Sequence, residues 1–165
     1  MDRERIEQTL RLWQAEPDKA KGKPTVKARA EGSKAVMEHG TFSWSTDLPA
    51  SLGGTNEAPS PTALLLSALA GCAVVFIRDT LAPQLGVRVD AIEATAQCET
   101  DARGLLGMNN VAPDMQNIGL TIAIRSTEDE AAVRQVYHVW QERCPVYLAL
   151  IKALPVATTL EIKRA

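Results

Sequence analysis

The feature that most constrains this 165-residue chain is an uncharged stretch with one cysteine, Cys72, near its centre. No charged side chain occurs from Ala63 to Ile77. Ser60 can cap the first free backbone N–H groups and Pro61 suits the first helical position, so we predict a helix that begins there and ends before Pro83. The uncharged stretch is shorter than the roughly 20 residues that span a bilayer. We therefore interpret it as a core helix buried on almost every side.

The composition is that of an ordinary globular protein, with 45% hydrophobic and 23% charged residues. A net charge of −2 offers no basic surface for nucleic acid. The first residues are followed by no apolar signal core, so we expect a cytoplasmic protein that does not act at a membrane. The length fits one domain. We expect an N-terminal helix and linker at residues 1–23 and a single domain at residues 24–165.

Periodicity places further helices and strands around this core helix. An apolar stripe of Ile6, Leu10 and Trp13 predicts a helix over residues 2–16. We expect antiparallel strands, two or three of them between residues 25 and 46, one at 87–100 with a bulge near Ala91, one at 116–125 and a closing one at 156–162. Strands without regular alternation with helices indicate an α+β fold with mostly antiparallel sheets.

The two remaining predicted helices flank a second cysteine, Cys144. Thr127 and Glu130 have the spacing of a capping box, and the helix that follows is expected to end near Arg143. A short helix over residues 145–154 would then place Cys144 at its N-cap. The positive end of a helix dipole favours a thiolate, which gives this cysteine a physical reason to be reactive.

Each of the three cysteines also has a purely structural interpretation. Cys72 alone is more often a small buried apolar residue than a nucleophile, because an apolar environment raises a thiol pKa. Cys98 shares a strand face with apolar residues and is expected to pack in the core. Three cysteines in a reducing compartment argue against a structural disulfide framework. With His39 and His138 as the two histidines and no Cys-x-x-Cys pair, we expect no metal site.

Four short motifs together suggest a family. They are Gly-Gly-Thr-Asn at 53–56, Ser-Pro at 60–61, Ala-Gly-Cys at 70–72 and Glu-Arg-Cys-Pro-Val at 142–146. In this order they resemble the OsmC/Ohr family of osmotically inducible and organic hydroperoxide resistance proteins, over roughly residues 26 to 163. The resemblance implies an OsmC-like fold, with sheets wrapped around two central helices in an intertwined homodimer.

The resemblance also implies a function. Cys72 matches the peroxidatic cysteine and Cys144 the resolving cysteine of a thiol peroxidase that acts on organic hydroperoxides. A thiolate attacks the peroxide, and the resulting sulfenic acid condenses with the second thiol to a disulfide. In the family a dithiol, notably a lipoyl group, reduces that disulfide. No metal or organic cofactor is implied.

The chain departs from the family pattern around the reactive thiol. Members use a glutamate to hold an arginine, and that arginine stabilises the thiolate. Thr62 and Ala63 stand where the glutamate is expected, and Glu31 stands where the arginine is expected. Residues that could substitute are Arg29, Lys34, Arg78 and Arg143 as cations, with Glu57 and Glu142 as carboxylates.

Three functional interpretations therefore stay open. The first is a cysteine-based peroxidase that reduces organic hydroperoxides. The second is a non-catalytic redox-sensing or small-ligand-binding protein on the same fold, which loss of the glutamate and arginine favours. The third is a structural protein with inert buried thiols, which a Cys-Pro at a helix start makes less attractive.

Overall fold

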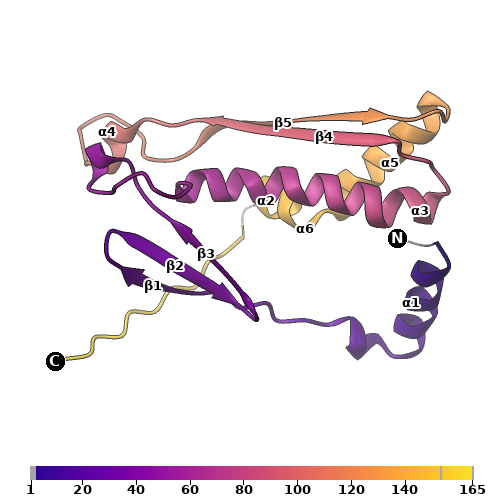
Figure 1. Ribbon diagram of the computed structural model, residues 1–165, viewed down its shortest axis with the longest axis horizontal. Helices are drawn as coiled ribbons and strands as arrows, with labels where there is room; N and C mark the ends of the chain where they lie inside the picture. The colour runs from indigo at the N-terminus through magenta and orange to yellow at the C-terminus, as the bar shows by residue number, and fades with distance from the viewer. Residues whose placement is uncertain (1–2, 153, 165) are drawn as a thin grey trace.

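The computed structural model describes residues 3–152 and 154–164, and one long apolar helical stretch runs through its centre (Figure 1). Helix α2 spans Pro61–Phe76 and continues through a π-helical turn, η3 (Ile77–Leu81), into α3 (Ala82–Leu85). As predicted, the side chain of Ser60 caps α2 by accepting a hydrogen bond from the backbone N–H of Ala63 at 3.2 Å.

The predicted end of this helix before Pro83 is wrong. Pro83 lies inside α3, and the helical stretch ends at Gly86, whose φ of +70° suits glycine. The physical reason is the π-helical turn, which interrupts the regular hydrogen-bond pattern and places the proline in the first turn of α3. A proline is tolerated there because the missing N–H has no obligatory partner.

Two antiparallel sheets flank this central stretch. Strands β1 (Lys27–Glu31), β2 (Lys34–His39) and β3 (Phe42–Thr46) form the first sheet in that order. Gly32 and Gly40 occupy the two tight turns with φ values of +61° and +59°. The antiparallel strands predicted between residues 25 and 46 are thus confirmed.

Strands β4 (Ala91–Glu99) and β5 (Gln116–Arg125) form the second sheet. Strand β5 has the predicted bounds. The bulge expected near Ala91 is instead a register shift between Gln97 and Glu99, and residues 87–90 are outside the strand. The reason lies in the preceding helix, because the backbone N–H of Val87 donates to the carbonyl of Ala82 rather than to a strand. The loop between the two strands contains a single helical turn, α4 (Ala102–Leu105).

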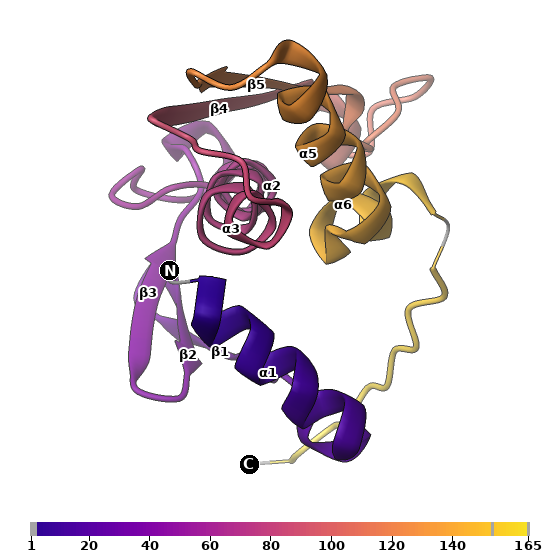
Figure 2. The same cartoon turned by 90° about the vertical axis from the view of Figure 1, so that its right-hand side faces the viewer.

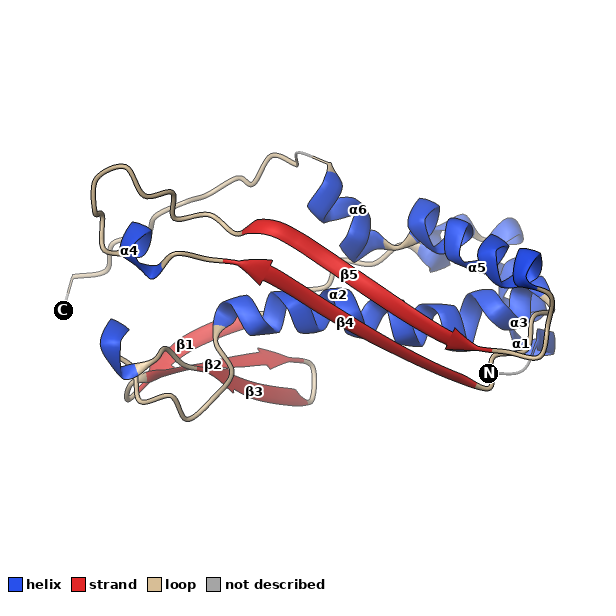
Figure 3. Ribbon diagram, turned by 90° about the horizontal axis from the view of Figure 1, so that it is seen from above, coloured by secondary structure: helices blue, strands red, loops and turns tan. Residues whose placement is uncertain are grey.

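Helices α5 (Glu130–Arg143) and α6 (Pro145–Ile151) lie beside α2, while the β4–β5 sheet crosses over it (Figures 2 and 3). The core lies where these elements meet and consists of Ala73, Ile77, Leu81, Val136, Trp140 and Cys144. Helix α5 ends at Arg143 as predicted. Its N-cap is Asp129 rather than Thr127, so the expected capping box does not form.

The central helical stretch is a core helix, although a single chain covers it incompletely. By length and composition Pro61–Leu85 could cross a membrane, with a mean hydropathy of 1.8. Ala73, Ile77 and Leu81 are nevertheless fully enclosed by the surrounding elements. Only 22% of the most apolar window is buried, and Val75 is 50% exposed.

The two ends of the chain carry exposed apolar side chains. Helix α1 (Arg3–Ala15) buries Ile6 and is followed by a short helix, η1 (Pro17–Ala20). The predicted closing strand at 156–162 is wrong for the single chain, since the described residues 154–164 are extended without strand pairing. Its apolar side chains Val156, Leu160 and Ile162 are 80–84% exposed. A strand requires a neighbouring strand edge, and no strand among the described residues of one chain pairs with this segment.

Candidate functional site

The structure brings two cysteines from distant parts of the sequence into contact. Cys72 lies in the C-terminal half of α2, and Cys144 lies between α5 and α6. Their sulfur atoms are 3.2 Å apart, within hydrogen-bond distance for thiols. Cys144 is fully buried and Cys72 is partly accessible. An S–S bond is about 2.05 Å long, so a shift of about 1 Å separates this pair from a disulfide.

The sequence explains locally why the second thiol sits there. Pro145 begins α6 and Cys144 occupies its N-cap, as predicted. The backbone N–H of Cys144 still donates to the carbonyl of Trp140 at the end of α5. The cysteine is therefore held between two consecutive helices, and its position depends on the packing of both.

Burial makes the partly accessible thiol a weak acid in this chain. Loss of solvent, with a further contribution from the hydrogen bond with Cys144, raises the pKa of Cys72 to about 11. A backbone hydrogen bond from Val146 at the start of α6 acts in the opposite direction but does not compensate. At pH 7 a pKa of 11 leaves about one thiol in 10,000 ionised, against about 3% for an ordinary cysteine.

None of the four candidate cations contacts a thiol within the described part of the chain. Arg29 pairs with Glu31 and Glu38, and Arg78 pairs with the adjacent Asp79. Arg143 points elsewhere and donates to the side-chain oxygen of Gln84 at 3.4 Å.

The remaining cation and the candidate carboxylates are also accounted for. Lys34 forms an ion pair with Glu57, the carboxylate that follows the glycine-rich loop. Glu142 is exposed on α5. Among residues 3–152 and 154–164 of the single chain, therefore, no cation contacts Cys72 to offset its desolvation.

A buried carboxylate that the sequence analysis did not single out organises the loop in front of α2. Asp47 is 4% exposed, and it accepts hydrogen bonds from the backbone N–H groups of Leu48, Thr55 and Glu57 and from the Thr55 hydroxyl. These donors, chiefly the Glu57 N–H, lower the pKa of Asp47 to about 2. The loop includes η2 (Ala50–Leu52).

This clamp fixes the start of the cysteine helix. The backbone N–H of Asp47 and the hydroxyl of Thr46 both donate to the carbonyl of Pro59, directly before the helix cap. Position 54 requires a glycine, because a Cβ there would lie 1.9 Å from the backbone carbonyl oxygen of Leu48. An acidic residue shortly before a Gly-Gly-Thr-Asn loop was the sequence signal for this arrangement.

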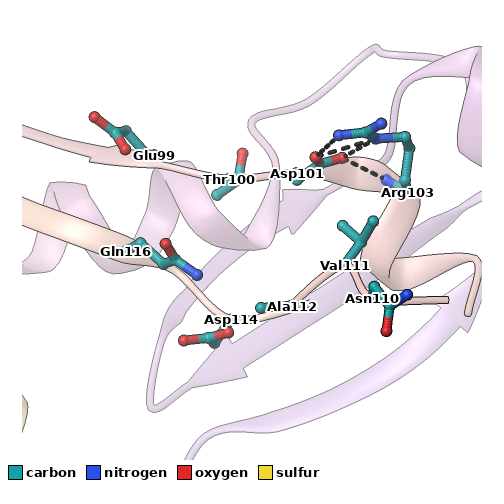
Figure 4. Close-up of a pocket in the computed structure, with 9 residues that line it drawn as sticks. All are labelled: Glu99, Thr100, Asp101, Arg103, Asn110, Val111, Ala112, Asp114 and Gln116. Carbon is teal, nitrogen blue, oxygen red and sulfur yellow. Dashed lines mark hydrogen bonds and ion pairs between the residues drawn. The ribbon is translucent and has the colours of Figure 1, made fainter. Parts of the chain in front are cut away.

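A cavity outside the thiol pair lies in the loop between β4 and β5 (Figure 4). Its volume is about 360 Å³ and its lining is mostly polar. Asp101 and Arg103 lie together at one side of it in a two-pronged ion pair, so their charges neutralise each other. No cysteine lines this cavity. Over residues 3–152 and 154–164, no group of three or more His, Cys, Asp or Glu side chains is arranged to hold a metal ion.

A family model described as OsmC-like protein matches residues 54–159. The fold is similar to that of an OsmC-like protein from Mycoplasma pneumoniae, with a TM-score of 0.66 and 20% identity over 79% of this chain and 88% of that one. It is also similar to the organic hydroperoxide resistance protein OsmC from Legionella pneumophila, with a TM-score of 0.56 and 19% identity over 78% of this chain and 89% of that one.

A search of curated proteins gave no match. The family model spans the cysteine helix, both thiols and the two-stranded sheet, which is well over half of the chain. The α+β arrangement of antiparallel sheets around α2 agrees with the solved structures. The chain therefore belongs to the OsmC-like protein family.

Proposed function

We propose that this protein is a thiol peroxidase that reduces organic hydroperoxides, with Cys72 as the reacting thiol and Cys144 as the resolving thiol. The single observation that carries the proposal is the 3.2 Å separation of the two sulfur atoms. A similar fold in proteins named for organic hydroperoxide resistance supports the choice of substrate class. The cytoplasmic location expected from the sequence is compatible with it.

The reaction follows from the two thiols alone. The Cys72 thiolate attacks one peroxide oxygen, the O–O bond breaks, and the alcohol leaves after taking up a proton. The sulfenic acid formed on Cys72 then condenses with Cys144, which gives a disulfide and one water molecule. An external dithiol, of the lipoyl type that the family resemblance implies, restores both thiols. The net change is hydroperoxide plus dithiol to alcohol, water and cyclic disulfide.

The high pKa of Cys72 means that the first step needs a cation, and the described residues of one chain place none at this thiol. We propose that this cation comes with dimerisation. Arg29 and Lys34 lie on the β1–β3 sheet, apart from the β4–β5 sheet in Figure 1, and can approach the cysteine helix of a second copy. An ion pair with the Cys72 thiolate of that copy would replace the present ion pair of Arg29 with Glu38 or of Lys34 with Glu57. Arg78 and Arg143 remain the alternatives from nearer elements.

Exposed apolar surface supports the homodimer. Val75 on α2 is half exposed, and Trp44 on β3 is more than a third exposed. The extended segment at 154–164 also presents alternating apolar side chains without a strand partner. Strand exchange between two copies would cover both features at once. Removal of residues 156–165 is expected to convert the dimer to a monomer in size-exclusion chromatography with light scattering.

A second candidate function is supported by the same pKa. A thiol that is mostly protonated at pH 7 suits a non-catalytic redox sensor or a small-ligand-binding protein, in which the disulfide forms slowly. The two functions differ in rate. A peroxidase oxidises Cys72 far faster than free cysteine reacts, and a binding protein does not.

Turnover of tert-butyl hydroperoxide with dihydrolipoamide as the reductant tests the proposal. We expect turnover by the unaltered protein and by Cys98→Ser, which is the matched control for loss of a thiol. Loss of turnover is expected in Cys72→Ser. In Cys144→Ser, Cys72 should still be oxidised once, to the sulfenic acid, but no disulfide with residue 144 should form. Equal activity of Cys72→Ser and the unaltered protein would contradict the assignment.

A further inference from the structure

A cavity of about 440 Å³ lies between the β1–β2 hairpin and the start of α2, and we call it the Lys34 cavity. Its lining contains two cations, Arg29 and Lys34, and one carboxylate, Asp47. An apolar surface with a cation beside it suits a partner that is apolar and carries a negative charge. The apolar residues that line it include Ala28, Ala30, Ala35, Leu48 and Pro61.

The exposed face of α2 has both of these properties. Leu65, Cys72 and Val75 lie seven and three positions apart, so they share one face of the helix. Leu65 is 39% exposed and Val75 is 50% exposed, while Cys72 is partly accessible. This ridge is apolar, and it becomes negatively charged when the thiol ionises. Within residues 3–152 and 154–164 of one chain, Lys34 does not contact Cys72, so a second copy is needed to bring them together.

Lys34 is the cation of this cavity that is more easily released. Arg29 pairs with two carboxylates, Glu31 and Glu38. Lys34 pairs with one carboxylate among the described residues, Glu57. The Lys34 ammonium can therefore reach a new partner by breaking a single ion pair, whereas the Arg29 guanidinium must give up two.

Glu57 and a thiolate would compete for the same ammonium. The hydrogen bond with Glu57 raises the pKa of Lys34, and the charges of Asp47 and Glu31 act in the same direction. The backbone of Glu57 is held in place, because its N–H donates to the Asp47 carboxylate at 3.0 Å. A further anion beside Lys34 is therefore opposed by carboxylates that are already there.

We propose that the Lys34 cavity receives the ridge of Leu65, Cys72 and Val75 from a second copy, where Lys34 pairs with the Cys72 thiolate and Glu57 competes for the ammonium. Glu57 is thus a restraint on the thiol, and removing its charge increases the ionised fraction of Cys72 in the dimer. The catalytic meaning of this restraint rests on the proposed peroxidase function, but the ionisation of Cys72 can be measured without any peroxide.

Ionisation of Cys72 in the fully reduced dimer tests this inference. The readout is the ultraviolet absorbance of the thiolate against pH, taken as the difference from the Cys72→Ser variant. Glu57→Gln should lower the midpoint by about 0.5 pH unit, since an exposed ion pair is worth a fraction of one pKa unit. Lys34→Gln should raise the midpoint, and Lys34→Arg should restore the lower value.

Two controls separate this restraint from a general effect of charge. Glu38→Gln is the matched control, because it weakens the hold on Arg29 in the same sheet and should leave the midpoint unchanged. In the monomer obtained by removal of residues 156–165, Glu57→Gln should have no effect.

The inference is overturned if Glu57→Gln leaves the midpoint of the dimer unchanged or raises it. It is also overturned if Glu38→Gln lowers the midpoint equally, if the same shift occurs in the monomer, or if the unaltered protein forms no dimer. Absence of peroxide turnover together with the expected shifts would instead refute the peroxidase and leave this inference standing.

Discussion

Oxidation of the thiol pair is expected to stabilise the protein strongly. Cys72 and Cys144 are 72 positions apart in the sequence, so a bond between them closes a long loop in the unfolded chain. The loop-entropy relation gives about 4 kcal/mol for a loop of this length. Unfolding entropy for a chain of 165 residues is about 0.35 kcal/mol/K near 60 °C. The melting temperature of the oxidised form should then exceed that of the reduced form by about 12 °C.

Thermal unfolding followed by circular dichroism measures this difference. The Cys98→Ser variant is used, so that Cys72 and Cys144 are the only thiols that can form a disulfide within the chain. One sample is reduced by a phosphine and another is oxidised by diamide before each is heated. The same comparison in Cys72→Ser should give no shift. A shift below about 2 °C in Cys98→Ser, with mass spectrometry showing complete disulfide formation, would refute the view that the folded chain holds the two sulfurs ready to bond without strain.

Three further predictions concern the reactive thiol and the loop before it. In the monomer obtained by removal of residues 156–165, the rate of Cys72 alkylation by iodoacetamide should rise with a midpoint near pH 11, and Cys144→Ala should move that midpoint downward; in the intact dimer the midpoint should be lower, and equal midpoints in monomer and dimer would contradict the proposal that dimerisation supplies the cation. Gly54→Ala should cost about 1–3 kcal/mol in urea unfolding, because its Cβ would meet the Leu48 carbonyl oxygen; no loss would show that the loop adapts freely. The pKa of Asp47 is lowered by folding to about 2, so its stabilisation is present above pH 4 and is lost as the pH falls toward 2; Asp47→Asn should lack this part of the acid unfolding profile.

Local patterns in the sequence predicted the helices and strands whose causes are local. Ser60 and Pro61 fix the start of α2, and alternation alone gave β5 its bounds. Two of the errors occurred where strand pairing decides the structure. Residues 156–162 alternate like a strand but have no edge to pair with in one chain. The bulge in β4 depends on its register with β5, which alternation within one strand does not encode.

The candidate site was likewise predictable from the sequence only where its causes are local. Sequence placed Cys72 in a core helix and Cys144 at a helix start, but only the family resemblance suggested that they meet. The partners of the cations were not predictable, because Arg29 reaches Glu38 across a strand pair whose register comes from folding.

We propose that the two thiols form one peroxide-driven redox pair. It is tested most directly by adding one equivalent of an organic hydroperoxide to the reduced protein and mapping the peptides without reduction. We expect a disulfide between Cys72 and Cys144 that forms much faster than free cysteine is oxidised. Cys98 should stay unmodified, and a lipoyl dithiol should reverse the disulfide fully. Unchanged thiols, or oxidation no faster than that of free cysteine, would rule out the peroxidase and favour the binding protein.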